Sequence, residues 1–431
     1  MLRATTSLSI LLALASAQHI GTAIKEVPLS FPSWKCTKSS SGKSKCVKQS
    51  TKLVIDAFHR NLHKVGATST SCYTNGSLDP TLCPDAATCA KNCALEGVDY
   101  AAAGMKVDGQ GSVTLSQQVK NADGTWTTVS PRAYLLAADG KNYVDLKMLN
   151  QELSFDVDIS QLVCGMNGAI YFSEMEANGG RSSLNPAGAA YGTGYCDAQC
   201  PQLSFINGEA NVGGQYGACC NEMDLFEANA RAQAYTPHAC GISSVYKGDC
   251  ANTDECTQET GVCDKWGCAF NPYSQHPDFY GLSKLVDTTK KFTVTTQFIT
   301  DTGTSSGNLA EIRRLYVQGG KIISNAAITY GDPQASTTSL TNPYCTSTSS
   351  WFTQRGGLTA MGQALQRGMV LVMSIWWDVG GYMNWLDTGS SGPCNETEGN
   401  PELINAQHPD VSVTVSNVRY GDLGTTYSGT V

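Results

Sequence analysis

The sequence predicts an all-β protein, built as a sandwich of two large antiparallel sheets with long loops and few short helices. Three observations favour this fold class. Strand-like segments recur along the whole chain, glycine-rich turns separate them, and helical patterns are rare. Because runs of strands without alternating helices are typical of two packed antiparallel sheets, we expect a sandwich rather than an α/β fold.

The predicted strands either alternate apolar and polar residues or contain runs of β-branched and apolar residues. Alternation indicates a strand that buries one face, because successive side chains point to opposite sides of a sheet. The continuous run MVLVMSIW at 369–376 indicates a strand that is buried on both faces. The other strands are expected at 52–55, 153–159, 292–298 and 411–415.

Helical periodicity is confined to two short segments, 84–95 and 358–365. Gly368 follows the second segment, and a glycine at this place commonly ends a helix. We therefore expect helices only as minor additions to the sheets.

The charge balance limits the kinds of partner. The chain carries a formal net charge of −8 at pH 7, and only 15% of its residues are charged. Nucleic acids and anionic membranes are bound through basic faces. We therefore expect neither a nucleic acid nor a membrane as partner, and a neutral substrate instead.

Residues 1–17 have the organisation of a secretory signal peptide. Arg3 precedes an apolar run at 8–15, and Ala15-Ser16-Ala17 provides the small residues of a cleavage site. A transmembrane span needs about 18 to 20 apolar residues, more than this run contains. We expect a secreted, extracellular protein whose mature chain, 18–431, forms a single domain with no appended module.

The eighteen cysteines agree with export, because an even number in an oxidising compartment predicts disulfides. We expect nine bridges. Zinc binding is the alternative, since the spacings of Cys196 with Cys200 and of Cys219 with Cys220 are also found among zinc ligands. No histidine accompanies these pairs, which favours bridging. Sequons at Asn75 and Asn395 fit a secreted surface.

Three carboxyl groups are crowded into the segment 219–240, CCNEMDLFEANARAQAYTPHAC. Glu222, Asp224 and Glu227 lie within six positions, so at least one pKa should be raised unless a substrate, a metal or a shared proton lies between them. The simpler interpretation is a solvated acidic strand or turn. On a strand, Glu222 and Asp224 share one face, and Glu227 joins them only if a β-bulge lies between Asp224 and Glu227.

With that bulge, the two glutamates suit hydrolysis of a glycosidic bond. Their carboxyl groups would come within about 5 to 6 Å, the separation used in double displacement with retention. One carboxylate then acts as nucleophile and the other as general acid, while Asp224 shares a proton or hydrogen bond with Glu222. We expect a bell-shaped activity profile that peaks at mildly acidic pH, with no metal and no cofactor.

The block from Cys219 to Asn229 and the following Thr236-Pro237-His238 closely resemble the active-site strand of glycoside hydrolase family seven, the fungal-type cellulases. The likeness covers nearly the whole mature chain. Further similar motifs, in the family's order, are TLCP at 81–84, YCDAQCP at 195–201, NPY at 271–273 and WLD at 385–387.

The resemblance implies a concanavalin-like β-jelly roll with a long cleft that cuts β-1,4-glucan with retention. It implies Glu222 as nucleophile, Asp224 as modulator and Glu227 as acid/base, with His238 beside the acid/base. It also implies that Cys196 and Cys200 pair with Cys220 and Cys219. The expected partner is cellulose, the expected state a monomer, and no carbohydrate-binding module is expected after the domain.

Flat aromatic side chains are expected along the cleft, because the C–H faces of a pyranose ring stack on them. The resemblance implies that Trp376 lies on the non-reducing side of the cut and Trp385 on the leaving side. Trp126 and Trp377 have a simpler interpretation as core or sheet-surface residues. The polar residues that the resemblance places in the cleft are Asn167, Tyr171, Asp197, Gln199 and Arg132.

Departures from the family pattern favour the endoglucanase branch over the cellobiohydrolases. The segments 207–214 and 387–393 are short, so a covering loop is missing, and His59 and Asn61 stand where tryptophans usually flank the cleft entrance. The long segment between Cys240 and Cys263 could provide a partial cover and keeps the cellobiohydrolase alternative open. An alternative of another class is a non-catalytic, metal-dependent lectin whose carboxylates bind Ca²⁺ or Mn²⁺.

Overall fold

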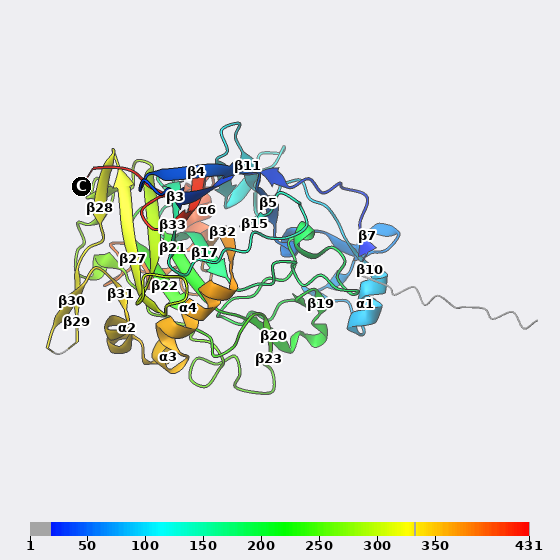
Figure 1. Cartoon of the computed structure of the whole chain (residues 1–431). Helices are drawn as coiled ribbons and strands as arrows, with labels where there is room; N and C mark the ends of the chain where they lie inside the picture. The colour runs from blue at the N-terminus through cyan, green and yellow to red at the C-terminus, as the bar shows by residue number, and fades with distance from the viewer. Residues whose placement is uncertain (1–18, 332, 431) are drawn as a thin grey trace, which may run out of the picture.

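A computed structural model describes residues 19–331 and 333–430 and confirms the all-β sandwich (Figure 1). The predicted signal peptide lies outside the described residues. The first sheet, which we call the inner sheet, has seven strands, all paired antiparallel. Its order is β2 (Leu29–Ser30), β5 (Lys52–Ile55), β15 (Arg132–Leu136), β32 (Val370–Trp377), β17 (Met166–Ser173), β21 (Glu222–Ala228) and β22 (Gln233–His238).

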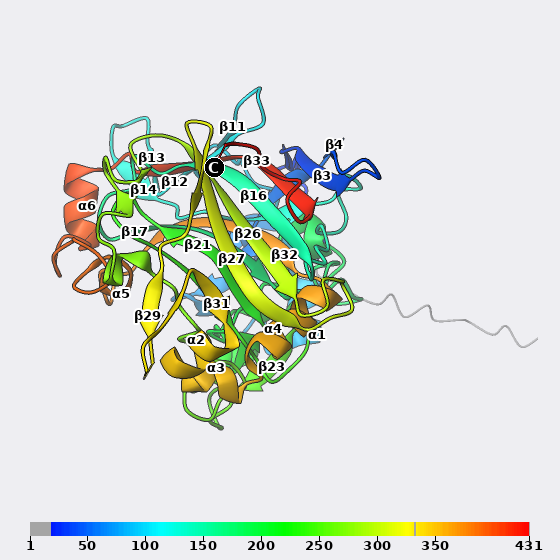
Figure 2. The ribbon, with the colours of Figure 1, turned by 60° about the vertical axis from the view of Figure 1, so that its left-hand side comes forward.

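The second sheet, which we call the outer sheet, has ten strands. Figure 2 shows its strands β16, β26 and β27 in front of β17, β21 and β32 of the inner sheet. All its pairs are antiparallel except that of β3 with β33. The strands are β11 (Met105–Val107), β12 (Val113–Ser116), β33 (Ser412–Asp422), β16 (Gln151–Asp158), β26 (Phe292–Thr300), β27 (Leu309–Gln318) and β28 (Lys321–Ser324), with β3 (Ser33–Lys38), β4 (Ser44–Gln49) and β31 (Ser339–Thr341) off this path.

The segments that precede or connect the strands of the two main sheets form several smaller sheets. One has four strands, β1 (His19–Ile20), β10 (Cys93–Leu95), β6 (Leu62–Lys64) and β7 (Ala67–Ser71). The two-stranded ones pair β8 (Tyr73–Thr74) with β9 (Ser77–Leu78), β13 (Gln118–Lys120) with β14 (Trp126–Thr128), β18 (Phe205–Ile206) with β19 (Glu209–Ala210), β20 (Tyr216–Cys219) with β23 (Tyr246–Asp249), β24 (Tyr280–Gly281) with β25 (Val286–Asp287), and β29 (Ile328–Tyr330) with β30 (Ala335–Thr337).

All five predicted strands are present, and the segment 369–376 coincides with β32, whose first six residues are buried. The helix expected at 84–95 is only partly correct. It ends at Asn92, and Cys93 is extended because it pairs with β6 and is bonded to Cys72. The helix expected at 358–365 is α4, which ends before Gly368, a residue with φ of 123°. The helices are α1 (Ala86–Asn92), α2 (Asn342–Thr348), α3 (Ser350–Gln354), α4 (Gly357–Arg367), α5 (Asn384–Asp387) and α6 (Pro401–Gln407).

The core lies between the two sheets and contains the apolar side chains of their facing sides. Phe172 and Phe226 of the inner sheet pack against Phe298 and Phe155 of the outer sheet, with ring centroids 6.1 and 5.9 Å apart. All four rings are fully buried, and burying each one contributes about 1.5 to 3 kcal/mol. This core fixes one face of the inner sheet and leaves its other face for a binding site.

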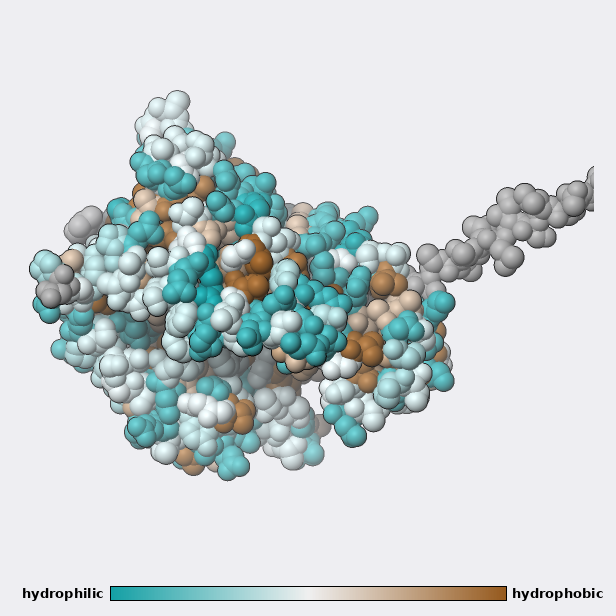
Figure 3. All heavy atoms as spheres, turned by 90° about the horizontal axis from the view of Figure 1, so that it is seen from below, coloured by the Kyte–Doolittle hydropathy of each residue, from teal (hydrophilic) through white to brown (hydrophobic). Residues whose placement is uncertain are grey.

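Nine disulfides join all eighteen cysteines, as expected. Cys196 is bonded to Cys220 and Cys200 to Cys219, so the zinc alternative for these pairs is wrong. The sequon residues Asn75 and Asn395 are exposed. In the part of the chain that the structure describes, no helix is long and apolar enough to span a membrane. The face in Figure 3 is mainly hydrophilic, with small separate apolar patches.

Candidate active site

A large cleft covers the face of the inner sheet that points away from the core. Its volume is about 1660 Å³, and Glu222, Asp224 and Glu227 all contribute to its lining. The strands β15, β32, β17, β21 and β22 each contribute at least one lining side chain. The crowded carboxyl groups therefore lie in a cavity large enough for an extended ligand. Glu222 and Asp224 are buried, so the simpler interpretation of this segment as a solvated acidic strand is wrong.

The predicted β-bulge is present. Asp224 pairs with Thr236 of β22, but Glu227 pairs with Ala234, so Leu225 and Phe226 together oppose one residue. Met223, Leu225, Phe226 and Ala228 are buried in the core. The extra residue restores the parity of Glu227, which therefore points into the cleft with Glu222 and Asp224.

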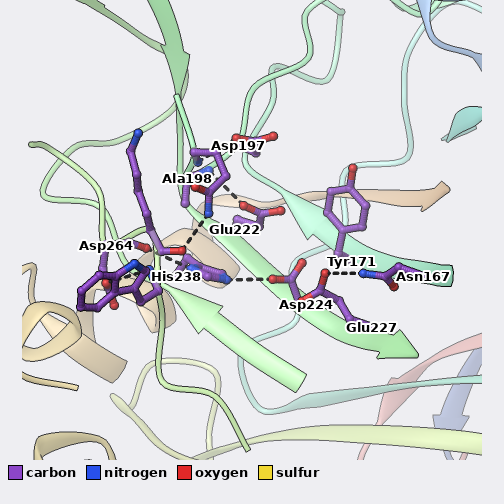
Figure 4. A network of polar contacts seen from close by, with 12 residues as sticks. Asn167, Tyr171, Asp197, Ala198, Glu222, Asp224, Glu227, His238 and Asp264 are labelled. Carbon is purple, nitrogen blue, oxygen red and sulfur yellow. Dashed lines mark hydrogen bonds and ion pairs between the residues drawn. The ribbon is translucent and has the colours of Figure 1, made fainter. Parts of the chain in front are cut away.

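Glu222 is held by the backbone of the neighbouring loop. The Ala198 N–H donates to its Oε2 over 3.0 Å (Figure 4). The disulfides at Cys196 and Cys200 fix both sides of Ala198 against the residues that precede β21. The side chain is only 8% exposed, and this fixed donor restricts its orientation.

His238 contacts Asp224 and also lies close enough to Glu227 to lower the pKa of that carboxyl. The two strands place His238 directly opposite Glu222, and its Nε2 lies 2.9 Å from Oδ2 of Asp224. Its Nδ1 lies 3.0 Å from the backbone oxygen of Asp264 (Figure 4). Because a carbonyl oxygen can only accept a hydrogen bond, Nδ1 carries the proton of this contact. With Nδ1 protonated, the Nε2–Asp224 contact requires one further proton, on the imidazole or on the carboxyl. The pair therefore holds a proton next to the two glutamates.

Glu227 is oriented by Asn167 of the neighbouring strand β17. The Asn167 Nδ2 donates to Oε1 of Glu227 over 2.9 Å, and its Oδ1 accepts the N–H of Ala228 over 3.2 Å. The second contact fixes which end of the amide faces the glutamate, because only the nitrogen end can donate. Glu227 itself is partly exposed and lines the cleft.

Burial raises the pKa of each of the three carboxyls, and the charges of neighbouring carboxylates add to this effect for Glu222 and Asp224. Burial and the charges of Asp224 and Asp197 raise the pKa of Glu222 well above its usual range. Burial and the charge of Glu227 do the same for the pKa of Asp224, against a hydrogen bond from Glu222. Burial also raises the pKa of Glu227, which the Asn167 hydrogen bond partly offsets. The raised pKa values favour a proton on at least one of these carboxyls, as acid catalysis requires.

Asp197, Tyr171 and Gln199 form a hydrogen-bonded layer beside Glu222. Tyr171 and Tyr195 share a hydrogen bond of 2.9 Å, and Tyr195 donates to Asp197 over 2.7 Å. Burial raises the pKa of Asp197. Gln199 donates its Nε2 to the backbone oxygen of Lys265 over 2.8 Å, which ties this layer to the far wall of the cleft. All three predicted residues line the cleft.

Arg132 also lines the cleft, and its guanidinium is engaged by two protein groups, Asp56 and Tyr195. Its Nε donates to Oδ2 of Asp56 over 2.8 Å, and its guanidinium lies 3.4 Å from the ring centroid of Tyr195. The charge is therefore paired on one side and stacked on the other, and the arginine mainly supports the layer that contains Asp197.

Both predicted tryptophans line the cleft, Trp376 from the end of β32 and Trp385 from α5. Trp376 is half-buried, whereas Trp385 is 48% exposed. Trp377 packs against the core, and Trp126 does not contribute to the cleft lining, which agrees with their simpler interpretation.

Sequence reasoning missed two exposed aromatic side chains of the cleft. Phe58 is 74% and Trp266 is 66% exposed, and both contribute to its lining. Trp266 lies between Cys263 and Cys268, which are bonded to Cys240 and Cys345, so its backbone is anchored on both sides. A tryptophan between two nearby cysteines was a signal that could have identified it.

The carboxyl cluster does not have the geometry of a metal site. Within residues 19–331 and 333–430, the groups whose ligand atoms lie close enough together for one ion all contain cysteines of disulfides. Glu222, Asp224 and Glu227 do not form such a group. The three carboxyl groups are instead engaged by protein partners: Glu222 by the Ala198 N–H, Asp224 by His238 and Glu227 by Asn167.

The raised pKa values predict that Glu222→Gln stabilises the protein near neutral pH. A carboxyl whose pKa is raised on folding is bound to a proton more tightly in the folded state, so folding stability falls as the pH rises above the unfolded pKa. Removing the charge should raise Tm by roughly 1 to 3 °C at pH 7 and by less at pH 4. Thermal unfolding at both pH values tests this, with the exposed Glu209→Gln as control. An equal effect at both pH values would contradict it.

Comparison with known proteins supports the geometric interpretation. The family model for glycosyl hydrolase family 7 matches residues 20–427. The chain is 55% identical over 432 residues to the probable endo-β-1,4-glucanase celB of Aspergillus terreus, which covers 100% of this chain and 99% of that protein.

Solved structures are similar over almost the whole chain. The Humicola insolens endocellulase EGI is 40% identical with a TM-score of 0.85, and the match covers 94% of this chain and 99% of that one. A family 7 cellobiohydrolase from Daphnia pulex is 36% identical with a TM-score of 0.86, covering 95% and 100%. These matches confirm the resemblance that the sequence motifs indicated: the chain belongs to glycosyl hydrolase family 7 and is a glycoside hydrolase.

Proposed function

We propose that this chain is a secreted endo-β-1,4-glucanase that hydrolyses internal bonds of cellulose with retention of configuration. The observation that carries the endo assignment is the exposure of the cleft. Phe58, Trp266 and Trp385 line it, yet 74, 66 and 48% of their surfaces are accessible. Side chains roofed by loops in a tunnel would be buried. A chain can therefore enter an open cleft at any internal position.

The disposition of the flanking segments supports the same proposal. Among the described residues, those that line the cleft include none between Cys240 and Cys263. This segment is instead held beside β20 by its strand β23. The short segment at 207–214 forms part of the β18–β19 hairpin and also does not contribute to the lining. The one candidate for a cover, the segment between Cys240 and Cys263, thus leaves the cleft uncovered, which favours the endoglucanase over the cellobiohydrolase.

In the proposed reaction, the ionised Glu222 attacks the anomeric carbon while Glu227 donates its proton to the glycosidic oxygen. The C–O bond breaks, the leaving chain carries the proton away, and the glucan remains esterified to Glu222. Glu227, now ionised, removes a proton from water, whose oxygen then attacks the same carbon and releases Glu222. Two inversions give net retention.

The other members of the site have supporting roles. Asp224 and His238 hold one proton between them beside Glu222, so they adjust the charge of the nucleophile as it forms and loses the ester. Asn167 orients Glu227. The Ala198 N–H points one oxygen of Glu222 away from the sugar and leaves the other for attack.

Binding of the glucan rests on Trp376 and Trp385 as stacking platforms, each contributing about 1 kcal/mol by analogy with aromatic pairs. Tyr171, Asp197, Gln199 and Arg132 supply hydrogen-bonding groups along the cleft, and Trp266 adds a platform that the sequence did not reveal. His59 and Asn61 line the cleft where the family pattern has tryptophans. Weaker binding of the glucan at these two positions suits release of the chain after each cut.

Export, a single domain and a monomeric state complete the proposal. The nine disulfides support a protein that folds in an oxidising compartment. The signal-like pattern at 1–17 supports export by the secretory route. The negative net charge supports a neutral polysaccharide as partner.

The test follows viscosity and new reducing ends of soluble carboxymethyl-cellulose with the purified chain. Random internal cleavage should lower the viscosity steeply after few cuts. The anomer released first, read by NMR before mutarotation, should be β. A slow fall in viscosity with release of mainly cellobiose would instead support the cellobiohydrolase, and an α product would contradict double displacement.

A further inference from the structure

Arg314 of β27 is a charged residue in the middle of the core. It is fully buried, with an exposed fraction of 0%, and its side chain points between the two sheets. Among the described residues, it has no carboxylate within ion-pair distance, in contrast to its neighbour Arg313, which is paired with Glu311 at the surface. A buried, unpaired charge is costly, so its presence needs a specific reason.

The reason lies at the bulge of the catalytic strand. The Nη2 of Arg314 donates a hydrogen bond to the backbone oxygen of Leu225. Leu225 is skipped on both sides: β17 pairs Tyr171 with Asp224 and Ile170 with Phe226, and β22 passes directly from Thr236 to Ala234. A backbone oxygen outside both ladders in a dry core must find another donor, and Arg314 provides one.

The arginine is itself held by the residue that faces the bulge. Tyr235 is the residue of β22 between the two registers, and the guanidinium of Arg314 lies 4.3 Å from its ring centroid. The ring of Tyr316, on the same strand as Arg314, lies 5.8 Å away. The Asn325 Nδ2 donates to the hydroxyl of Tyr235 over 3.3 Å. The aromatic faces stabilise the charge and aim the donor at Leu225.

We propose that Arg314 is a positioning residue for the reaction: by bonding the Leu225 oxygen it maintains the bulge that turns Glu227 into the cleft. Arg314 lies outside the cleft lining and affects Glu227 only through the backbone between Leu225 and Glu227. The inference rests on the proposed role of Glu227 as acid/base. Without the guanidinium, the bulge relaxes toward regular pairing and the Glu227 carboxyl moves relative to the glycosidic oxygen.

The test is Arg314→Met, which keeps the length and bulk of the side chain but removes the donor and the buried charge. A displaced acid slows reactions that need a proton on the leaving group. We expect kcat on cellotetraose to fall about 10- to 100-fold with little change in KM, since a shift of about 1 Å can cost this much. The first step with dinitrophenyl cellobioside, which needs no acid, should change less than 3-fold, by the same reasoning on proton transfer.

Two controls make the result specific. Arg313→Met removes an arginine from the next position, where the side chain is exposed, and should leave both rates unchanged. Arg314→Lys keeps a charged donor on a long stem and should recover most of the loss. If Arg314→Met does not fold, Arg314→Gln, which is neutral and too short to span the same gap, is measured in the same way.

An equal loss on both substrates, or wild-type rates on both in a folded variant, would overturn the proposal. The proposed function fails separately, if Glu227→Ala itself shows no difference between the two substrates. In that case Glu227 is not the acid, whatever Arg314 does.

Discussion

Replacing Glu222 with alanine is expected to reduce hydrolysis of cello-oligosaccharides by about 10⁴-fold or more, because the covalent intermediate can no longer form. The truncation leaves a space below the anomeric carbon that a small anion can enter. Azide should therefore restore turnover of dinitrophenyl cellobioside, with Glu227 still in place. Since azide attacks from the side of the missing carboxylate, the product should be the α-glycosyl azide.

The configuration of this product is the decisive measurement, and NMR reads it directly. The exposed Glu209→Ala serves as the matched control and should keep wild-type activity, because that side chain lies outside the cleft. A β-glycosyl azide from Glu222→Ala, or residual hydrolysis above about one per cent of wild type, would contradict the role of nucleophile.

Replacing Glu227 with alanine is expected to reduce hydrolysis of cello-oligosaccharides by about 10² to 10⁴-fold, the usual contribution of a general acid. The alkoxide leaving group of a sugar needs a proton, whereas dinitrophenolate does not. The first step with dinitrophenyl cellobioside should remain fast, and the glycosyl-enzyme should accumulate because no base activates water. Azide needs no base, so it should release this intermediate as the β-glycosyl azide.

Mass spectrometry of the trapped intermediate and the anomer of the azide product test this prediction together. Glu227→Gln adds a check on binding, since the amide keeps the hydrogen-bonding shape of the site and should leave the affinity for cellotetraose within about 3-fold. If the activated substrate lost as much as the natural one, or if no ester formed on Glu222, another residue would be the acid.

Much of the fold was predictable because local patterns and tertiary packing agree. Residues 369–375 are all buried, and the alternation of Glu222, Met223, Asp224 and Leu225 follows the sandwich. The bulge was predictable from chemistry rather than from propensity: three carboxyl groups can share a cleft only if one extra residue restores their parity. The segments 207–214 and 387–393 could be recognised as short because motifs of the family flank them in the sequence.

What could not be predicted depends on contacts between distant segments. The partner of His238 follows from the register of β21 against β22, which places it opposite Glu222. The role of Arg314 depends on a strand 89 positions away from Leu225. The helix expected at 84–95 is shortened because Cys93 pairs with a strand, a case in which tertiary context overrides local propensity.

The bulge in β21 also means that the face to which Glu227 points depends on the number of residues that separate it from Asp224. Side chains alternate between faces, so the distance along a strand between two groups on one face changes only in whole pleats of about 6.6 Å. Glu222 pairs with His238 and Glu227 with Ala234, so the two glutamates lie two pleats apart although five positions separate them in the sequence. If the segment kept its five positions but paired regularly, without the bulge, Glu227 would point into the core. The bulge and the number of residues between Asp224 and Glu227 are therefore linked, because a change in one requires a matching change in the other if Glu227 is to stay in the cleft.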